Sequence, residues 1–187
     1  MVIAEPMNKT GAQTRWVFGY GSLIWNPGFP HLEAKPATLM GAHRSLCIYS
    51  HRHRGTEAVP GLVFGLLRGG SCRGMAFAVA ETAWAEVYAY LLAREQDRGV
   101  YREAYRPLHF GGHEPVRGLA FVVNERHEQF AGQLSLVEQL RIVRQGMGES
   151  GANTAYVLNT ARHLATLGIV DRNLVALVAA LETDARV

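Results

Sequence analysis

The spacing of hydrophobic residues changes along the chain, and the change predicts where strands give way to helices. The first two-thirds carries short apolar runs rich in aromatic and β-branched residues, which are typical of buried strands. We expect strands at residues 16–19, 39–50, 62–67, 73–80, 101–110 and 117–123. The segment 30–38 is interpreted as an irregular connection, and Gly69-Gly70 as a hairpin-type break. Between residues 73 and 80 one face carries only Gly and Ala, which predicts close packing against a helix or an opposite barrel wall.

Helical periodicity begins at about Thr82, a candidate N-cap, and continues to about Arg98. The apolar stripe of this helix consists of Trp84, Val87, Tyr88, Leu91 and Leu92. Further helices are predicted after a capping box at Ser135–Glu138 (with Leu136, Leu140 and Val143 on one face), at about 154–167, and after an Asp171 cap. Strands without regular βαβ alternation, followed by helices, indicate the α+β class with a mostly antiparallel or mixed sheet.

Composition limits the class of protein without choosing a function. The chain has 187 residues, 48% of them hydrophobic and 19% charged, which is typical of a globular protein. We expect residues 1–14 to form a loose tail and residues 15–187 a single domain. The formal net charge of +3 comes without a long Lys/Arg block, and aromatic and basic residues do not interleave on one strand motif. Nucleic acid is therefore not an expected partner.

The cysteines and the apolar runs indicate the compartment. Cys47 and Cys72 both lie in apolar, strand-like segments and are expected to be buried free thiols. The N-terminus lacks the pattern of a signal peptide, and no apolar run approaches the length of a membrane span. We therefore expect a cytoplasmic protein without a membrane partner. The sequence does not indicate an oligomeric state.

The first predicted strand ends in a loop of small residues, Gly19-Tyr20-Gly21-Ser22, and a turn follows at Asn26-Pro27-Gly28. Glycine leaves backbone N–H groups accessible to a ligand, although a tight turn after a core strand explains the same pattern. A dinucleotide fingerprint would need glycine at Ile24, and a nucleophile elbow would need glycine at Tyr20. Both of those sites are excluded.

Glu95 occupies the next position on the apolar stripe of the first helix. A carboxylate on a core-facing stripe is partly desolvated, which raises its pKa and suits a general acid/base near neutral pH. The alternative is that Glu95 lies where the stripe meets solvent and pairs with Arg94, Arg98 or Arg102. The pattern alone leaves both interpretations open.

A cationic group consists of Arg44, Arg52 and Arg54, and the last two lie in a predicted loop. These arginines could bind an anionic ligand or form an ordinary solvated basic loop. His51 and His53 could ligate a metal, but the sequence places no third ligand beside them. No metal site is predicted.

Several segments together resemble the ChaC-like family of γ-glutamylcyclotransferases. Tyr20-Gly21-Ser22-Leu23-Ile24-Trp25 resembles the opening motif of that family, and Tyr90–Glu95 resembles a later segment that ends in Arg-Glu. Gly148–Tyr156 resembles its glycine-rich segment ending in tyrosine. The segments Arg54-Gly55-Thr56, Pro60-Gly61 and Gly70–Gly74 resemble the subgroup that acts on glutathione.

The resemblance implies a fold and roles for particular residues. The fold would be a small, partly closed, mixed β-barrel with surrounding helices. Glu95 would be catalytic, and Tyr20, Gly21, Ser22 and Leu23 would hold the γ-glutamyl end of the substrate through backbone groups. Arg54 and Tyr156 would contact the substrate, although Tyr156 alone could also be a boundary residue of a helix.

The implied reaction converts glutathione into 5-oxoproline and cysteinyl-glycine by attack of the γ-glutamyl amine on its own γ-carbonyl. The substrate brings the nucleophile, so no cofactor is expected. One alternative is the same reaction on other γ-glutamyl peptides or amines. Another is a non-catalytic binding or regulatory protein, against which the presence of Glu95 argues.

Overall fold

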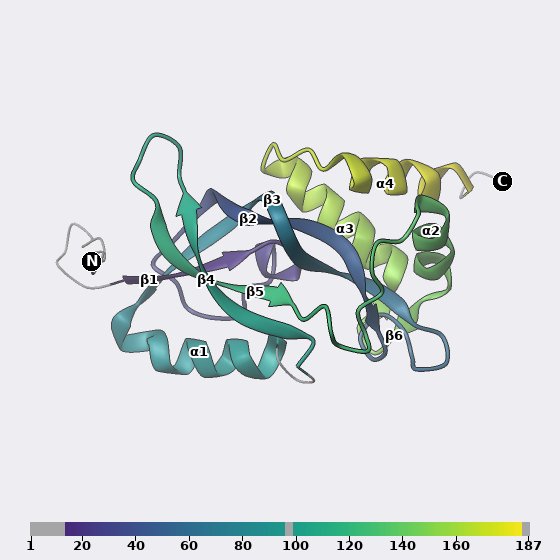
Figure 1. Ribbon diagram of the computed structural model, residues 1–187, viewed down its shortest axis with the longest axis horizontal. Helices are drawn as coiled ribbons and strands as arrows, with labels where there is room; N and C mark the ends of the chain where they lie inside the picture. Colours follow the sequence, from purple (N-terminus) through teal and green to yellow (C-terminus); the bar gives the residue numbers. More distant parts are fainter. Residues whose placement is uncertain (1–13, 96–98, 185–187) are drawn as a thin grey trace. The chain divides into compact units, whose positions relative to one another are not determined.

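The computed structural model describes residues 14–95 and 99–184 (Figure 1). The chain divides into two compact units, and each is made of two separate stretches of sequence. The first unit contains the chain up to Arg44 together with Leu66–Asn124, and the second contains Ser45–Gly65 and Glu125–Val187. The expected tail falls largely outside the described residues, and the single domain over residues 15–187 stays a prediction.

Five strands form a closed barrel in the order β1-β3-β2-β4-β5. They are β1 (Thr14–Gly19), β2 (Glu33–Ser50), β3 (Gly61–Ala80), β4 (Tyr101–His109) and β5 (Val116–Val123). β1 pairs antiparallel with β3 and parallel with β5, so the barrel is mixed. The α+β class and the mixed barrel are confirmed. The barrel is closed rather than partly closed.

The core of the first unit lies between the strands and helix α1 (Glu81–Glu95), which follows β3 directly (Figure 1). Val17 of β1 is in register with Phe77 on β3 and with Leu119 on β5, so these strands present a continuous apolar surface. Val87 and Leu91 of α1 are buried in the same cluster. The other members of the predicted stripe, Trp84, Tyr88 and Leu92, pack around it partly buried. The predicted stripe is therefore confirmed.

The small-residue face of β3 makes room for large rings of β1. Phe18 is in register with Ala76, and Trp16 with Ala78. A Cβ added to Gly74 would lie 2.8 Å from the Phe18 ring atom Cζ. The neighbouring strand therefore explains the close packing that the sequence predicted.

Three sequence-based boundaries are wrong. β2 begins at Glu33, within the stretch interpreted as irregular, because most of residues 33–38 are exposed or half-buried and give no hydrophobic signal. β3 continues through the predicted break, because Gly69 and Gly70 adopt φ values of 95° and 71° that bend the strand without ending it. Helix α1 begins at Glu81, so Thr82 lies inside its first turn and is not the N-cap.

The second unit contains helices α2 (Leu136–Gln145), α3 (Asn153–Thr166) and α4 (Arg172–Asp184), which contact one another. A short hairpin of β6 (Met147–Gly148) and β7 (Gly151–Ala152) lies between α2 and α3 and overlaps the glycine-rich segment Gly148–Tyr156.

The predicted ends of these helices are largely confirmed. Ser135 forms the predicted capping box with Glu138, and Asp171 Oδ1 accepts a hydrogen bond from Leu174 N at 3.2 Å. Leu136, the first residue of α2, was expected on one face with Leu140 and Val143 but is 42% exposed, whereas Val143 and the adjacent Ile142 are buried.

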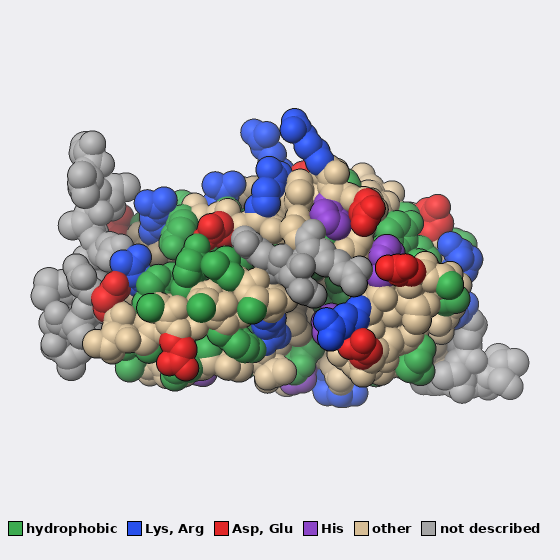
Figure 2. Space-filling model, turned by 90° about the horizontal axis from the view of Figure 1, so that it is seen from below, with side chains coloured by type: hydrophobic (Ala, Val, Ile, Leu, Met, Phe, Trp, Pro, Cys, Tyr) green, Lys and Arg blue, Asp and Glu red, His purple; other side chains and the backbone are tan. Residues whose placement is uncertain are grey.

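The face drawn in Figure 2 carries side chains of both charges. On the face drawn in Figure 2, Lys and Arg side chains lie interspersed with Asp and Glu, and hydrophobic side chains lie between them. This distribution agrees with the small formal net charge of +3. Within the described residues, no helix has the length and apolar character that a membrane span requires.

The capping assignments can be tested with two conservative substitutions. Ser135→Ala removes a hydroxyl that accepts from Glu138 N, and we expect it to lower the free energy of unfolding by about 0.5–2 kcal/mol. Thr82→Ala is the matched control, and we expect almost no loss because Thr82 is exposed and caps nothing. Urea unfolding followed by circular dichroism measures both. Equal losses in the two variants would contradict the assignment.

Candidate active site

The loop after β1 forms a short 3₁₀ turn, η1 (Ser22–Ile24). Its first internal hydrogen bond runs from Ile24 N to Gly21 O at 3.0 Å, so the turn itself does not use the N–H groups of Gly21, Ser22 and Leu23. Leu23 is buried in the core cluster beneath α1 and anchors the turn. A Cβ on Gly19 would lie 2.9 Å from Leu23 Cβ, so this approach requires glycine at the strand end.

Both ends of Tyr20 are held inside the first unit. Its hydroxyl donates to the carbonyl of Phe121 at 3.0 Å, and its own carbonyl accepts from Arg44 Nε at 2.6 Å. Arg44 is buried and also donates to the carbonyl of Arg73 at 2.7 Å. Arg44, predicted as part of a cationic group, therefore holds the backbone of the loop.

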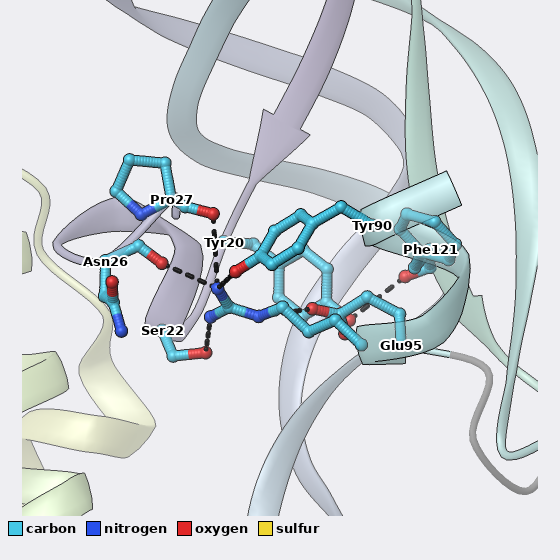
Figure 3. Close-up of polar contacts among 8 residues, drawn as sticks. Tyr20, Ser22, Asn26, Pro27, Tyr90, Glu95 and Phe121 are labelled. Atoms are coloured by element: carbon cyan, nitrogen blue, oxygen red, sulfur yellow. Dashed lines mark hydrogen bonds and ion pairs between the residues drawn. The ribbon is translucent and has the colours of Figure 1, made fainter. Parts of the chain in front are cut away.

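Glu95 is the last residue of α1, and its side chain is 16% exposed. Burial raises the pKa of Glu95 above its ordinary value of about 4.5, and the neighbouring Arg94 opposes that rise. Arg94 Nε lies 3.3 Å from Glu95 Oε1. The carboxylate of Glu95 is therefore desolvated, as its place on the apolar stripe predicted. It is also paired with Arg94, as the alternative interpretation predicted. Figure 3 shows the Glu95 side chain turned toward the side of the helix end where Tyr20 and Ser22 lie.

Arg94 joins the end of α1 to the loop. Its terminal nitrogens donate to Asn26 O at 2.8 Å, Pro27 O at 3.2 Å, the Tyr90 hydroxyl at 2.9 Å and Ser22 Oγ at 3.0 Å (Figure 3). The sequence suggested Arg94 only as a possible ion-pair partner of Glu95. Most of its other partners are carbonyl or hydroxyl oxygens brought close by the fold, so spacing along the chain could not have indicated them.

The second unit brings Arg54 and Tyr156 together. The Arg54 guanidinium lies over the Tyr156 ring at 5.2 Å and donates to the carbonyl of Ser150, with Ala152 O at 3.4 Å. Burial lowers the pKa of Arg54 from its usual value. Arg54 therefore has a partly desolvated charge, unlike a fully solvated loop arginine.

Tyr156 lies in the first turn of α3 and is buried. Its hydroxyl oxygen accepts a hydrogen bond from Phe64 N at 3.2 Å. In the same turn, the Asn153 side chain accepts from Leu62 N at 2.6 Å and donates to Leu62 O at 2.7 Å. Polar side chains at the start of α3 thus bind the main chain of β3 within the second unit.

The remaining candidates have ordinary partners. Arg52 Nε pairs with Glu149 Oε2 at 2.8 Å, and His53 Nδ1 lies 2.9 Å from Ser150 Oγ. Among the described residues, no group of three possible metal ligands comes together. Cys47 and Cys72 are buried free thiols, as predicted. Burial raises the pKa of Cys47 to about 12, so its thiol is not a nucleophile at neutral pH.

Comparison with known proteins decides the family. The family model of ChaC-like proteins matches residues 15–184. The chain belongs to the ChaC-like family. A glutathione-specific γ-glutamylcyclotransferase of Escherichia coli is 30% identical over 85% of this chain and 69% of its own length. One of Schizosaccharomyces pombe is 32% identical over 80% of this chain and 82% of its own length.

A solved structure confirms the fold. The crystal structure of a γ-glutamyl cyclotransferase specific to glutathione from yeast gives a TM-score of 0.81 at 23% sequence identity. The match covers 91% of this chain and 96% of the yeast chain. The ChaC-like resemblance inferred from the sequence is therefore confirmed, and the fold agrees with it. The individual roles of Glu95, Tyr20–Leu23, Arg54 and Tyr156 stay predictions.

The raised pKa of Glu95 predicts that the free energy of unfolding depends on pH. A raised pKa means that the folded state favours the protonated form of Glu95. The resulting contribution to the free energy of unfolding is fully present below pH 4.5, the ordinary pKa, and is lost as pH rises through the pKa of the folded state. Glu95→Gln removes the ionisable group and leaves the other partners of Arg94 in place. We expect its stability relative to wild type to increase as pH rises above 4.5 and then to level off.

Urea unfolding of both proteins across that pH range measures the difference. If the stability of Glu95→Gln relative to wild type falls with rising pH instead, the ion pair with Arg94 outweighs the effect of burial. The pKa of Glu95 would then be lowered.

Proposed function

We propose that this ChaC-like protein is a γ-glutamylcyclotransferase that cleaves glutathione into 5-oxoproline and cysteinyl-glycine. The observation that carries the proposal is the desolvated carboxylate of Glu95, placed at the helix end that Arg94 joins to the loop after β1. The names of the curated relatives in Escherichia coli and Schizosaccharomyces pombe support glutathione as the substrate.

The reaction forms one bond and breaks one. The α-amine of the γ-glutamyl group attacks the γ-carbonyl carbon and gives a tetrahedral intermediate with a five-membered ring. The C–N bond to cysteine then breaks, and the leaving nitrogen gains a proton as the carbonyl re-forms. Because nucleophile and electrophile belong to one molecule, holding the chain folded supplies an effective molarity on the order of 10⁵ M or more. No cofactor is needed.

Glu95 can serve both proton transfers. The ionised carboxylate accepts a proton from the substrate ammonium group, and the resulting acid returns it to the leaving nitrogen. A raised pKa suits this role, because it makes the protonated form that must serve the leaving nitrogen easier to reach. The N–H groups of Gly21, Ser22 and Leu23, which the turn leaves unused, can bind the developing oxyanion or the γ-glutamyl end of the substrate.

Arg54 and Tyr156 are also substrate contacts in this proposal. The assignment follows from the family resemblance and is supported by the desolvated guanidinium of Arg54 over the Tyr156 ring. A guanidinium in this state is suited to one of the two carboxylates of glutathione. The buried free thiols of Cys47 and Cys72 suit the proposed cytoplasmic location, where glutathione keeps thiols reduced.

The role of Glu95 can be tested by substitution. Glu95→Gln keeps the size of the side chain but cannot exchange a proton at neutral pH, so kcat for 5-oxoproline release should fall about 10²–10⁴-fold. Glu95→Asp withdraws the carboxylate by about one bond length and should cost about 10²-fold. Glu86→Gln is the matched control, because Glu86 is an exposed carboxylate on the same helix and should leave kcat unchanged.

Circular dichroism confirms that each variant is folded, and γ-glutamyl dipeptides assayed in parallel define the substrate range. A folded Glu95→Gln protein with normal turnover would disprove the mechanism. A wild-type protein that releases 5-oxoproline from no γ-glutamyl compound would instead favour the binding or regulatory role.

The role of Arg54 predicts a different kinetic effect. Arg54→Ala removes a charge-assisted contact to the substrate, worth about 1.5–3 kcal/mol, so KM for glutathione should rise about 10–100-fold with a smaller change in kcat. Arg162→Ala replaces an exposed arginine of the same unit and serves as the control. An unchanged KM in folded Arg54→Ala would show that Arg54 holds only the hairpin of β6 and β7.

A further inference from the structure

The guanidinium of Arg94 binds the loop and Glu95 at the same time. Its side chain is only 20% exposed. Nε faces Glu95, one terminal nitrogen faces Asn26 O, Pro27 O and the Tyr90 hydroxyl, and the other faces Ser22 Oγ. An exposed ion pair contributes little to stability, but a half-buried guanidinium with partners on three nitrogens fixes the position of each partner.

The chemistry of arginine also fixes the direction of the Ser22 hydroxyl. A guanidinium has donors and no acceptor, so Ser22 Oγ accepts a hydrogen bond from Arg94. The hydroxyl hydrogen of Ser22 then points away from Arg94 and can donate to another group. Ser22 is thereby prepared to donate to an anion or a carbonyl oxygen rather than to accept from an ammonium group.

The loop is shaped for this contact. Gly28 adopts a φ of 74°, and a Cβ at this position would overlap the hydroxyl of Tyr90 and lie 3.5 Å from the Arg94 terminal nitrogen Nη1. Only glycine allows the turn to close this tightly over the side chains of Tyr90 and Arg94. The close approach therefore depends on residues of both the loop and the helix.

We propose that Arg94 is a positioning residue of the proposed cyclotransferase, which holds the carboxylate of Glu95 and the donating hydroxyl of Ser22 in fixed relation to each other. This inference rests on the proposed function. Arg94 touches no reacting atom in this scheme and acts through Glu95 and Ser22. Its positive charge also opposes the rise that burial causes in the pKa of Glu95.

Kinetic measurements on two substitutions test the role. Arg94→Lys keeps the charge but replaces a planar fork by a single point of contact, so we expect kcat to fall about 10–100-fold. Arg94→Met removes the charge as well and should lower kcat further. Arg102→Met replaces an exposed arginine on β4 as the matched control and should leave kcat and KM unchanged. Ser22→Ala combined with Arg94→Lys should cost less than the product of the two single effects, because both act through one contact.

A readout independent of activity is the titration of Glu95, measured by NMR of side-chain ¹³C-labelled glutamate and assigned with Glu95→Gln. We expect the pKa of Glu95 to be higher in Arg94→Met than in wild type, and closer to wild type in Arg94→Lys. If Arg94→Met does not fold, the Arg94→Lys kinetics and the double variant still decide the question. Folded Arg94→Lys with wild-type kcat, or full additivity with Ser22→Ala, would overturn the proposal.

The two proposals fail in different ways. If wild-type protein releases no 5-oxoproline from glutathione, the proposed function is wrong. The NMR titration still measures the coupling of Arg94 to Glu95 in that case, and an unchanged Glu95 pKa in folded Arg94→Met would refute the coupling by itself.

Discussion

The desolvation of one carboxylate, balanced by one guanidinium, is the constraint on which the first unit depends. Helix α1 packs Val87 and Leu91 into the barrel cluster, and the same stripe carries Glu95 out of full contact with water. An ionised carboxyl group in such a place is unfavourable unless a cation and hydrogen bonds compensate it. Arg94 supplies that compensation and reaches the loop after β1 with its remaining nitrogens. The packing of the helix therefore determines both the desolvated environment of the Glu95 carboxylate and the position of the loop.

Arginines hold loop backbones in both units. Arg44 binds the carbonyls of Tyr20 and Arg73, and Arg94 binds those of Asn26 and Pro27. In the second unit, Arg54 donates to the carbonyls of the hairpin formed by β6 and β7. A guanidinium can bind several carbonyl oxygens at once because its donors lie in a rigid plane. In the loop after β1, the hydrogen bonds of the turn itself leave the N–H groups of Gly21, Ser22 and Leu23 unused, so they can bind a ligand.

Periodicity in the sequence predicted the features that depend on burial. The strands β1 and β5 and the stripe of α1 follow from apolar spacing, and Glu95 was found because it continues that stripe. The start of β2 and the continuity of β3 were missed, since exposed residues and paired glycines give no hydrophobic signal. The role of Arg94 was also missed, because main-chain carbonyls are identical at every residue and only the fold selects which of them an arginine meets. The substrate came from the family resemblance and could not come from spacing.

The pH dependence of kcat/KM for 5-oxoproline release from glutathione shows whether Glu95 carries the proton. We expect an acidic limb with an apparent pKa above the ordinary glutamate value of 4.5, equal to the pKa of Glu95 measured by NMR in the free enzyme. The limb should disappear from the residual activity of Glu95→Gln. A rate that stays constant down to pH 4.5, or an acidic limb that persists in Glu95→Gln, would contradict the claim that Glu95 carries the proton.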